Sequence, residues 1–143
     1  MIKLTKQVQS KHDCEYLYDL VNDTDEYTNF LPFCTQSQVL SQEDNKKTCL
    51  LVFSKGPVEQ KLVTRNELQP HRRIDFFLEE GPFSHLYGYW TFEPKSGGTI
   101  VKLYIEYAFS HTFIQMTFGP FFKSLSHELV EVFCERADEL KLY

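Results

Sequence analysis

The periodicity of the apolar residues changes near residue 110, and this change restricts the fold more than any other feature. Between residues 35 and 110, apolar and polar residues alternate in short runs that turn-forming segments separate. Such runs are typical of closely spaced antiparallel strands. From residue 118 onward the apolar residues recur every three or four positions, the spacing of an amphipathic α-helix. We therefore predict a strand meander followed by one long helix.

Capping and turn residues place the other elements. We expect a first strand over residues 2–9, a helix over 12–22 that Ser10 caps, and a short helix over 25–31 that Pro32 ends. The final helix, over 118–140, contains Gly119 and Pro120, which predict a kink or a two-part helix. The six strands of the meander are expected at residues 38–40, 48–54, 58–68, 74–78, 84–92 and 101–109.

These elements predict an α+β fold in the order β-α-α-β6-α, and a length of 143 residues suits one domain over 1–143. A curved antiparallel sheet wrapped around a long C-terminal helix leaves space for an apolar pocket. The chain also contains 13 Phe, 8 Tyr and 1 Trp. So much aromatic surface needs burial, a ligand or a partner.

Cysteine spacing and the N-terminal residues indicate the cellular compartment of the protein. The four cysteines show no zinc-ligand spacing, so we expect free thiols in a reducing compartment. We find no apolar core of a secretory signal and no apolar run long enough to span a membrane. These features predict a cytoplasmic protein, with peripheral binding at the inner membrane face as an alternative.

The sequence offers little support for catalysis. It contains no G-x-S-x-G, H-E-x-x-H or phosphate-binding glycine loop, and its five histidines are scattered. We therefore predict no catalytic residue and no metal site.

Charge is unevenly distributed around a net value of -5. Residues 46–73 contain seven bases and two acids, whereas residues 13–26 contain six acids and no base. The basic stretch suits phospholipid headgroups or ribosomal RNA phosphates, and a solvated sheet face is the simpler alternative. Lys55, Lys61 and Arg65 are the candidate contacts, and Lys61 and Arg65 are expected on the same side of one strand. The negative net charge argues against diffuse nucleic-acid binding, DNA included.

Four segments carry a resemblance to a known family. They are LVNDTDEYTNFLPFC (20–34), SKGPVEQKLVTRN (54–66), GPFSHLYGYWTF (81–92) and FGPFFKSLSHELVEVFCERADEL (118–140). In this order they resemble the START-like helix-grip superfamily of polyketide cyclase and lipid transport proteins (SRPBCC). The more similar branch holds the coenzyme-Q-binding proteins and the bacterial ribosome-association toxins. The resemblance implies the same β-α-α-β6-α fold.

The resemblance and the aromatic clusters together indicate a ligand pocket. Thr28 stands where family members commonly have Pro, and Phe33 makes the rim of the expected loop bulkier. Trp90 shares a strand face with Gly88, whose missing side chain leaves room for a close approach. Packing in the core is the alternative role for each aromatic candidate. The candidate pocket residues are Tyr27, Phe30, Leu31, Pro32, Phe33, Trp90, Leu103, Phe118 and Phe122.

Three functions follow from the resemblance. The first is non-enzymatic carriage of a hydrophobic ligand, ubiquinone or a related polyprenyl lipid, with docking at a membrane surface. The second is a ribosome-association toxin that binds the large ribosomal subunit and blocks subunit joining. The third is a polyketide cyclase or dehydratase, which needs a polar group buried in the cavity. No cofactor is expected apart from the bound lipid.

Overall fold

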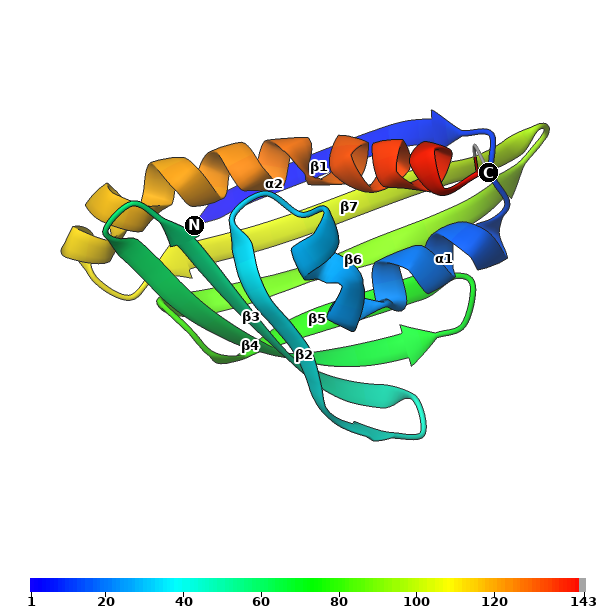
Figure 1. Cartoon of the computed structure of the whole chain (residues 1–143). Helices are drawn as coiled ribbons and strands as arrows, with labels where there is room; N and C mark the ends of the chain where they lie inside the picture. Colours follow the sequence, from blue (N-terminus) through cyan, green and yellow to red (C-terminus); the bar gives the residue numbers. More distant parts are fainter. Residues whose placement is uncertain (142–143) are drawn as a thin grey trace.

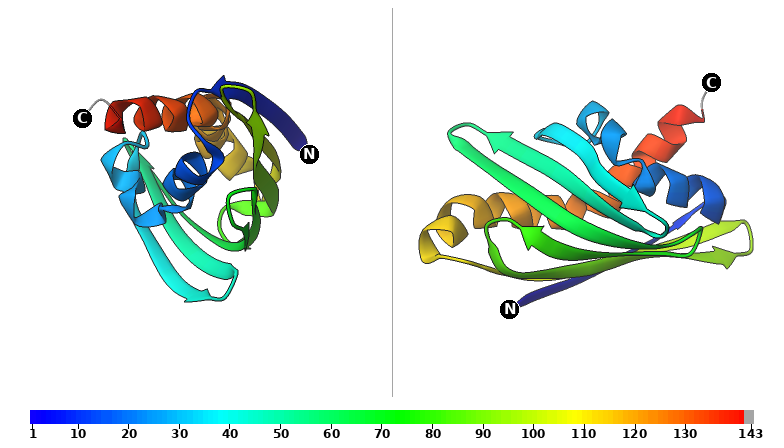
Figure 2. Two further views of the ribbon diagram at one scale, coloured as in Figure 1. Left: turned by 90° about the vertical axis from the view of Figure 1, so that its right-hand side faces the viewer. Right: turned by 90° about the horizontal axis from the view of Figure 1, so that it is seen from below.

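The fold is a curved antiparallel sheet that wraps around one long helix (Figures 1 and 2). The computed structural model describes residues 1–141. In chain order the elements are β1 (Ile2–Ser10), α1 (Cys14–Asn22), the 3₁₀ helix η1 (Thr24–Asn29), β2 (Cys34–Glu43), β3 (Lys46–Lys55), β4 (Val58–Gln69), β5 (Arg73–Glu80), β6 (Phe83–Lys95), β7 (Gly98–Phe109) and α2 (Thr112–Leu140).

The sheet has seven strands in the order β1-β7-β6-β5-β4-β3-β2, and every neighbouring pair is antiparallel. Strands β2 to β7 form the predicted meander, and β1 adds to its far edge beside β7. The chain leaves β1, passes through α1 and η1, and re-enters the sheet at the opposite edge as β2 (Figure 1). The predicted α+β helix-grip architecture is therefore confirmed.

The start of α1 differs from the prediction. Asp13, not Ser10, caps this helix, and its carboxylate accepts a hydrogen bond from the Tyr16 amide at 2.8 Å. Ser10 is the last residue of β1, and its hydroxyl instead accepts from the His12 amide at 3.2 Å. The expected cap at Ser10 is wrong because strand pairing with Thr99 extends β1 through this residue.

Two further boundaries differ for related reasons. β2 is much longer than the predicted 38–40, because pairing with β3 recruits polar residues of an edge strand that show no apolar alternation. The turn that follows is correspondingly short, with Asp44 at φ 52°. The second helix is a 3₁₀ helix that ends at Asn29 and not at residue 31.

α2 is one helix from Thr112 to Leu140 and continues through Pro120, so it is not in two parts. It begins six residues before the predicted start at 118, where the extended backbone of His111 precedes it. Most side chains of its first turns are exposed, and for this reason the apolar period begins only later. In the described part of the chain, no helix is both long and apolar enough to cross a bilayer.

The core lies between the concave face of the sheet and α2. Leu103 of β7 and Val130 and Ala137 of α2 are completely inaccessible to solvent. A second group of aromatic residues, around Phe83 and Phe122, fills the end where α2 begins. The helix therefore contributes one buried stripe along most of its length, as its period predicts.

Candidate ligand-binding cavity

A cavity of about 110 Å³ lies between the concave face of the sheet and α2. Strands β3 to β7 form its floor, α2 covers it, and α1 with η1 closes one side. Its walls are mostly apolar and aromatic. The lining residues are Val21, Thr24, Tyr27, Leu31, Cys49, Leu51, Phe53, Leu62, Thr64, Asn66, Ile74, Phe76, Leu86, Trp90, Ile105, Phe122, Leu125, Ser126, Leu129 and Phe133.

One region of the lining is polar. Thr64 and Asn66 lie on the same inner face of β4 as Leu62. The Thr64 hydroxyl donates a hydrogen bond to Asn66 Oδ1 at 2.9 Å. Asn66 Nδ2 lies 3.7 Å from the sulfur of Cys49, and Thr24 Oγ1 lies 3.4 Å from the same sulfur. A thiol is a weak hydrogen-bond acceptor. The Asn66 amide therefore keeps donor capacity for a better acceptor in the cavity.

A buried lysine stands beside this polar region. The Lys47 side chain donates to the backbone carbonyl of Asn22 and, at 2.9 Å, to Asn22 Oδ1. It thereby ties β3 to the last residue of α1. Burial lowers the pKa of Lys47, while the negative charges of Asp23 and Asp25 act in the opposite direction.

The two titratable side chains in the lining are held in their neutral forms. Burial raises the pKa of Tyr27, whose hydroxyl donates to the Val21 carbonyl and so ties η1 to α1. Burial also raises the pKa of the Cys49 thiol. At neutral pH both groups are therefore suited to hydrogen bonding, and neither is charged.

The predicted pocket residues fall into two sets. Tyr27, Leu31, Trp90 and Phe122 line the cavity together. The other five lie outside its lining: Phe30, Pro32, Phe33, Leu103 and Phe118. Trp90 contacts Phe133 of α2 edge to face, with ring centroids 5.2 Å apart.

The five outlying residues have identifiable roles in packing. Leu103 is fully buried in the core, and Phe118 packs against the rings of Phe83 and Phe109. The ring of Phe30 contacts the ring of Phe133, with centroids 5.1 Å apart. Pro32 forms part of the turn before β2 and is half-buried. Phe33 is 48% exposed, so its bulk lies at the surface and not at the cavity wall.

The space that Gly88 was expected to leave for a ligand is already filled. A Cβ atom at Gly88 would lie 2.2 Å from Cζ of Phe76 and 2.6 Å from the backbone oxygen of Tyr104. The glycine therefore lets the Phe76 ring approach the backbone of β6 closely, and that ring also lines the cavity.

Sequence reasoning missed the polar residues of the lining, above all Thr24, Cys49, Thr64 and Asn66. A signal existed for β4, because Thr64 and Asn66 share the parity of the apolar Leu62 and so had to face inward. The contribution of Thr24 depends on where η1 packs, which no local pattern reveals.

The candidate basic contacts do not form one cationic patch. Lys61 pairs with Glu80 at 3.3 Å, and Arg65 pairs with Glu79 at 3.3 Å. Both acids belong to β5, which antiparallel pairing brings beside β4. Lys55 lies apart from them, with its amine 5.0 Å from the centre of the Phe33 ring. Two of the seven bases in residues 46–73 are thus paired with acids of the next strand.

Comparisons with known proteins agree with this architecture. The model of the family described as "Polyketide cyclase / dehydrase and lipid transport" matches residues 11–134. The ribosome association toxin RatA of Pseudomonas aeruginosa is 37% identical over 126 residues, which cover 87% of each chain. The mitochondrial coenzyme Q-binding protein COQ10 of Dictyostelium discoideum is 25% identical, over 96% of this chain and 69% of that protein.

A solved structure shows the same fold at low sequence identity. A START superfamily protein from Mycobacterium smegmatis superimposes with a TM-score of 0.75 at 17% identity, over 96% of this chain and 98% of that one. The order of the elements, the helix held in a curved sheet and the match over residues 11–134 lead to the same assignment. This chain belongs to the polyketide cyclase / dehydrase and lipid transport family, with the START-like helix-grip fold.

Proposed function

We propose that this protein binds and carries a hydrophobic molecule with a compact polar head, a ubiquinone or a similar polyprenyl lipid, without catalysing a reaction. The observation that carries the proposal is the largely apolar cavity, in which Thr24, Cys49, Thr64 and Asn66 form one connected polar region. The name of the coenzyme Q-binding relative supports the same ligand class.

The lining suggests how a quinone ring binds. The ring lies against Trp90 and Phe133, and burial of its apolar area supplies about 25 cal/mol per Å². One ring oxygen accepts a hydrogen bond from Asn66 Nδ2, whose partner within the protein is the weak thiol acceptor of Cys49. Because Tyr27 and Cys49 have raised pKa values, neither supplies a base at neutral pH, and this favours binding over acid–base catalysis.

The size of the cavity limits what this conformation holds. A volume of about 110 Å³ is well below the ~300–1,000 Å³ of typical ligand pockets, so it suits a ring and not a polyprenyl tail. The tail requires η1 to separate from α2, where Tyr27 and Phe30 both contact Phe133 at ring distances of 5.2 and 5.1 Å. Uptake of a long-chain lipid therefore involves opening at this contact.

Trp90 supplies a direct test because it is the single tryptophan of the chain and lines the cavity. Titration with a short-chain ubiquinone is expected to quench its fluorescence to saturation. Asn66→Leu removes the proposed donor and is expected to weaken binding about tenfold, equivalent to ~1.4 kcal/mol. The matched exposed variant Asn29→Leu is expected to bind as the wild type does. Absence of saturable quenching, or equal affinity in all three proteins, contradicts the proposal.

A carrier also needs a membrane contact, and the end of the molecule where α2 begins suits one. Phe113 and Met116 are 74% and 72% exposed, and Phe33 is 48% exposed. Residues 111–127 contain no acid, and Lys55 and Lys123 add positive charge near these apolar side chains. Exposed aromatic residues beside lysines favour the surface of an anionic bilayer.

This contact is tested with sedimenting vesicles of phosphatidylglycerol and phosphatidylcholine. We expect binding to the anionic vesicles, and a loss of most of it in the double variant Phe113→Ser with Met116→Ser. Leu140→Ser, at the opposite end of α2 and 44% exposed, is the matched control. Unchanged binding of the double variant rules out this surface.

The second candidate function is association with the large ribosomal subunit, and the name of the Pseudomonas aeruginosa relative favours it. Lys55 is the strongest of the three candidate contacts, because Lys61 and Arg65 are paired with acids of β5. Lys55→Glu is expected to reduce co-sedimentation with ribosomes in low salt, whereas Lys95→Glu, at the β6–β7 turn, is not. Equal sedimentation of both variants with ribosomes argues against Lys55 as a contact.

A further inference from the structure

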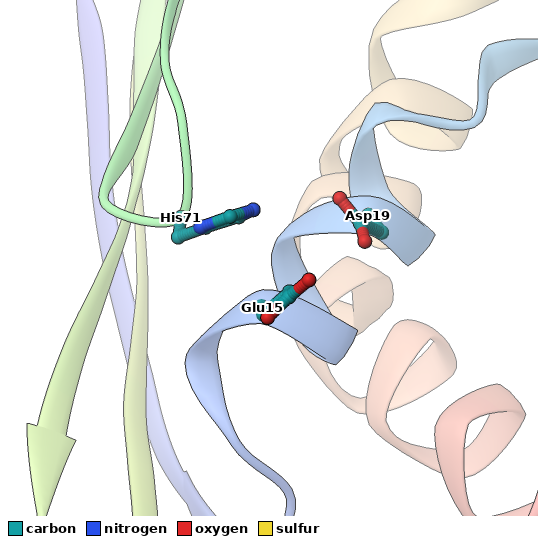
Figure 3. A group of neighbouring side chains, drawn as sticks. All are labelled: Glu15, Asp19 and His71. Atoms are coloured by element: carbon teal, nitrogen blue, oxygen red, sulfur yellow. The ribbon is translucent and has the colours of Figure 1, made fainter.

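Three potential metal ligands from two distant segments meet outside the cavity. Glu15 and Asp19 are one turn apart on α1, and His71 lies in the turn between β4 and β5 (Figure 3). One ligand atom from each of the three lies within 4.8 Å of the others. In Figure 3 the His71 ring points from its turn toward the helix face that bears both carboxylates.

The three side chains lie close together without bonding directly to one another in the described part of the chain. Among residues 1–141, no hydrogen bond and no ion pair joins any two of the three side chains. Zinc binds imidazole nitrogen and carboxylate oxygen at about 2.0–2.2 Å, which places two ligands of one ion about 3–4 Å apart. Small side-chain rotations therefore bring all three atoms to coordination distance of one ion.

His71 is held in place by its surroundings. Its backbone adopts φ 66°, and the turn is closed by a hydrogen bond from the Arg72 amide to the Gln69 carbonyl at 3.0 Å. Its ring packs edge to face on Tyr18, with centroids 5.5 Å apart. On the other side, the spacing of Glu15 and Asp19 places two carboxylates on one helix face, where like charges repel. A cation between them removes this repulsion.

We propose that Glu15, Asp19 and His71 bind one divalent transition-metal cation of the Zn²⁺ class. Imidazole nitrogen selects such ions over Mg²⁺ and Ca²⁺, which prefer oxygen ligands alone. Both carboxylates are exposed, so water completes the coordination. The guanidinium of Arg72, which donates to the His71 carbonyl at 3.1 Å, is a nearby positive charge that moderates the affinity.

The site has a structural consequence for the cavity. α1 continues into η1, which supplies Thr24 and Tyr27 to the lining, and the β4–β5 turn joins two strands of the cavity floor. A bound ion clips α1 to this turn. It therefore stabilises the folded state and favours the closed arrangement of α1 and η1 over the sheet.

The experiment is a Zn²⁺ titration of the full chain after treatment with a chelator, followed by calorimetry and thermal unfolding. We expect one ion per chain and a rise in Tm of about 5 °C at saturating metal. His71→Asn keeps a residue that tolerates the positive φ and removes the imidazole. This variant and Asp19→Asn are each expected to weaken binding at least tenfold.

Two controls separate this site from general metal binding. The double variant Glu135→Gln with Glu139→Gln removes another pair of exposed acids one turn apart, on α2, and is expected to bind Zn²⁺ as the wild type does. Cys134→Ser tests whether a thiol is responsible, and it too is expected to retain binding. The proposal is wrong if the wild type shows no saturable binding, or if His71→Asn and Asp19→Asn bind Zn²⁺ unchanged.

Discussion

Inward-facing polar side chains determine the chemistry of the cavity to which we assign a ligand. Asn66 and Thr64 occupy positions on β4 at which an apolar residue would complete the core. The Thr64 hydroxyl donates to Asn66, and the Asn66 amide in turn donates to the sulfur of Cys49. The half-buried amide of Asn66, whose acceptor is the weak thiol of Cys49, favours a ligand that supplies a stronger one. The proposed ligand specificity therefore rests on a few polar side chains within a largely apolar wall.

The thiols of Cys34 and Cys134 make the free energy of unfolding depend on pH in the alkaline range. Burial raises the pKa of each thiol from 9.0 to about 11, and for Cys134 the charge of Asp138 adds to this effect. The folded chain thus keeps protons that the unfolded chain releases between pH 9 and 11. The resulting stability is complete below pH 9 and declines as the pH rises toward 11.

Replacement of both residues by alanine is expected to flatten this decline, although it lowers stability at pH 8. Chemical denaturation of the wild type and the double variant at several values between pH 8 and 11 measures the two slopes. The tyrosines titrate in both proteins, so the difference isolates the thiols. Parallel pH profiles contradict the prediction.

Gly88→Ala tests the packing of Phe76. The added Cβ would lie 2.2 Å from the Phe76 ring and 2.6 Å from the backbone of Tyr104, so the ring has to move into the cavity. We expect the free energy of unfolding to fall by about 1–3 kcal/mol. Gly119→Ala is the control, because its Cβ meets no atom closer than 3.5 Å and alanine favours a helix by about 0.5–1 kcal/mol. A stabilised Gly88→Ala protein would refute this account.

At the scale of elements, α2 divides into two halves of different character. Residues 112–127 contain no acid and include the exposed Phe113 and Met116, whereas residues 128–140 carry five acids and one arginine. The acidic half is anchored to the start of the chain, where Glu131 pairs with Lys6 at 3.2 Å and Asp138 bonds to His12 at 2.7 Å. The first half is therefore the part of the helix with unpartnered apolar surface.

Pro120 lies inside α2 and cannot donate the helical hydrogen bond to the carbonyl of Met116. Because proline in a helix interior costs up to ~3 kcal/mol, Pro120→Ala is expected to raise the free energy of unfolding by about 1–3 kcal/mol. Denaturant unfolding at constant pH measures the change. Pro57→Ala, in the β3–β4 turn, is expected instead to lower the free energy of unfolding by about 0.4–1 kcal/mol, because the unfolded chain gains conformational entropy when the proline is removed. Destabilisation by Pro120→Ala means that the proline fits a bend which the fold requires.

At the scale of the whole molecule, aromatic contacts hold α2 to both the sheet and η1. The Phe133 ring lies 5.2 Å from the rings of Tyr27 and Trp90, and 5.1 Å from that of Phe30. Phe133, Tyr27 and Trp90 also line the cavity, so the proposed ligand binding and the stability of the fold depend on the same side chain, Phe133.

Phe133→Ala is expected to lower the free energy of unfolding by about 3–5 kcal/mol and to increase the binding of a hydrophobic fluorescent dye. If the alanine variant fails to fold, Phe133→Leu replaces it in the experiment, with smaller changes expected in both the free energy of unfolding and dye binding. Phe113→Ala, at an exposed position of the same helix, is expected to leave stability within about 0.5 kcal/mol of the wild type. Reduced dye binding in a folded Phe133 variant contradicts the coupling.

Predictability from the sequence differed between the fold and the candidate site. The positions of the meander strands and of the long helix follow from alternation and the 3.6-residue period, since both patterns reflect which face of an element is buried. Tyr27, Leu31, Trp90 and Phe122 were named as pocket residues and lie in the lining. Leu103 and Phe118 share the same inward orientation but pack against other side chains, and periodicity cannot separate a cavity wall from a filled core.

The sequence by itself determined the α+β class, the order of the elements and the family, because these depend on local periodicity and on segments that recur in order. Only the tertiary structure decided which charges remain available and which polar groups meet. Antiparallel pairing places Glu79 and Glu80 beside Arg65 and Lys61, and packing of α1 on the sheet brings Glu15 and Asp19 to His71. These encounters join residues far apart in the chain, and the register and packing that bring them together are set by the fold as a whole.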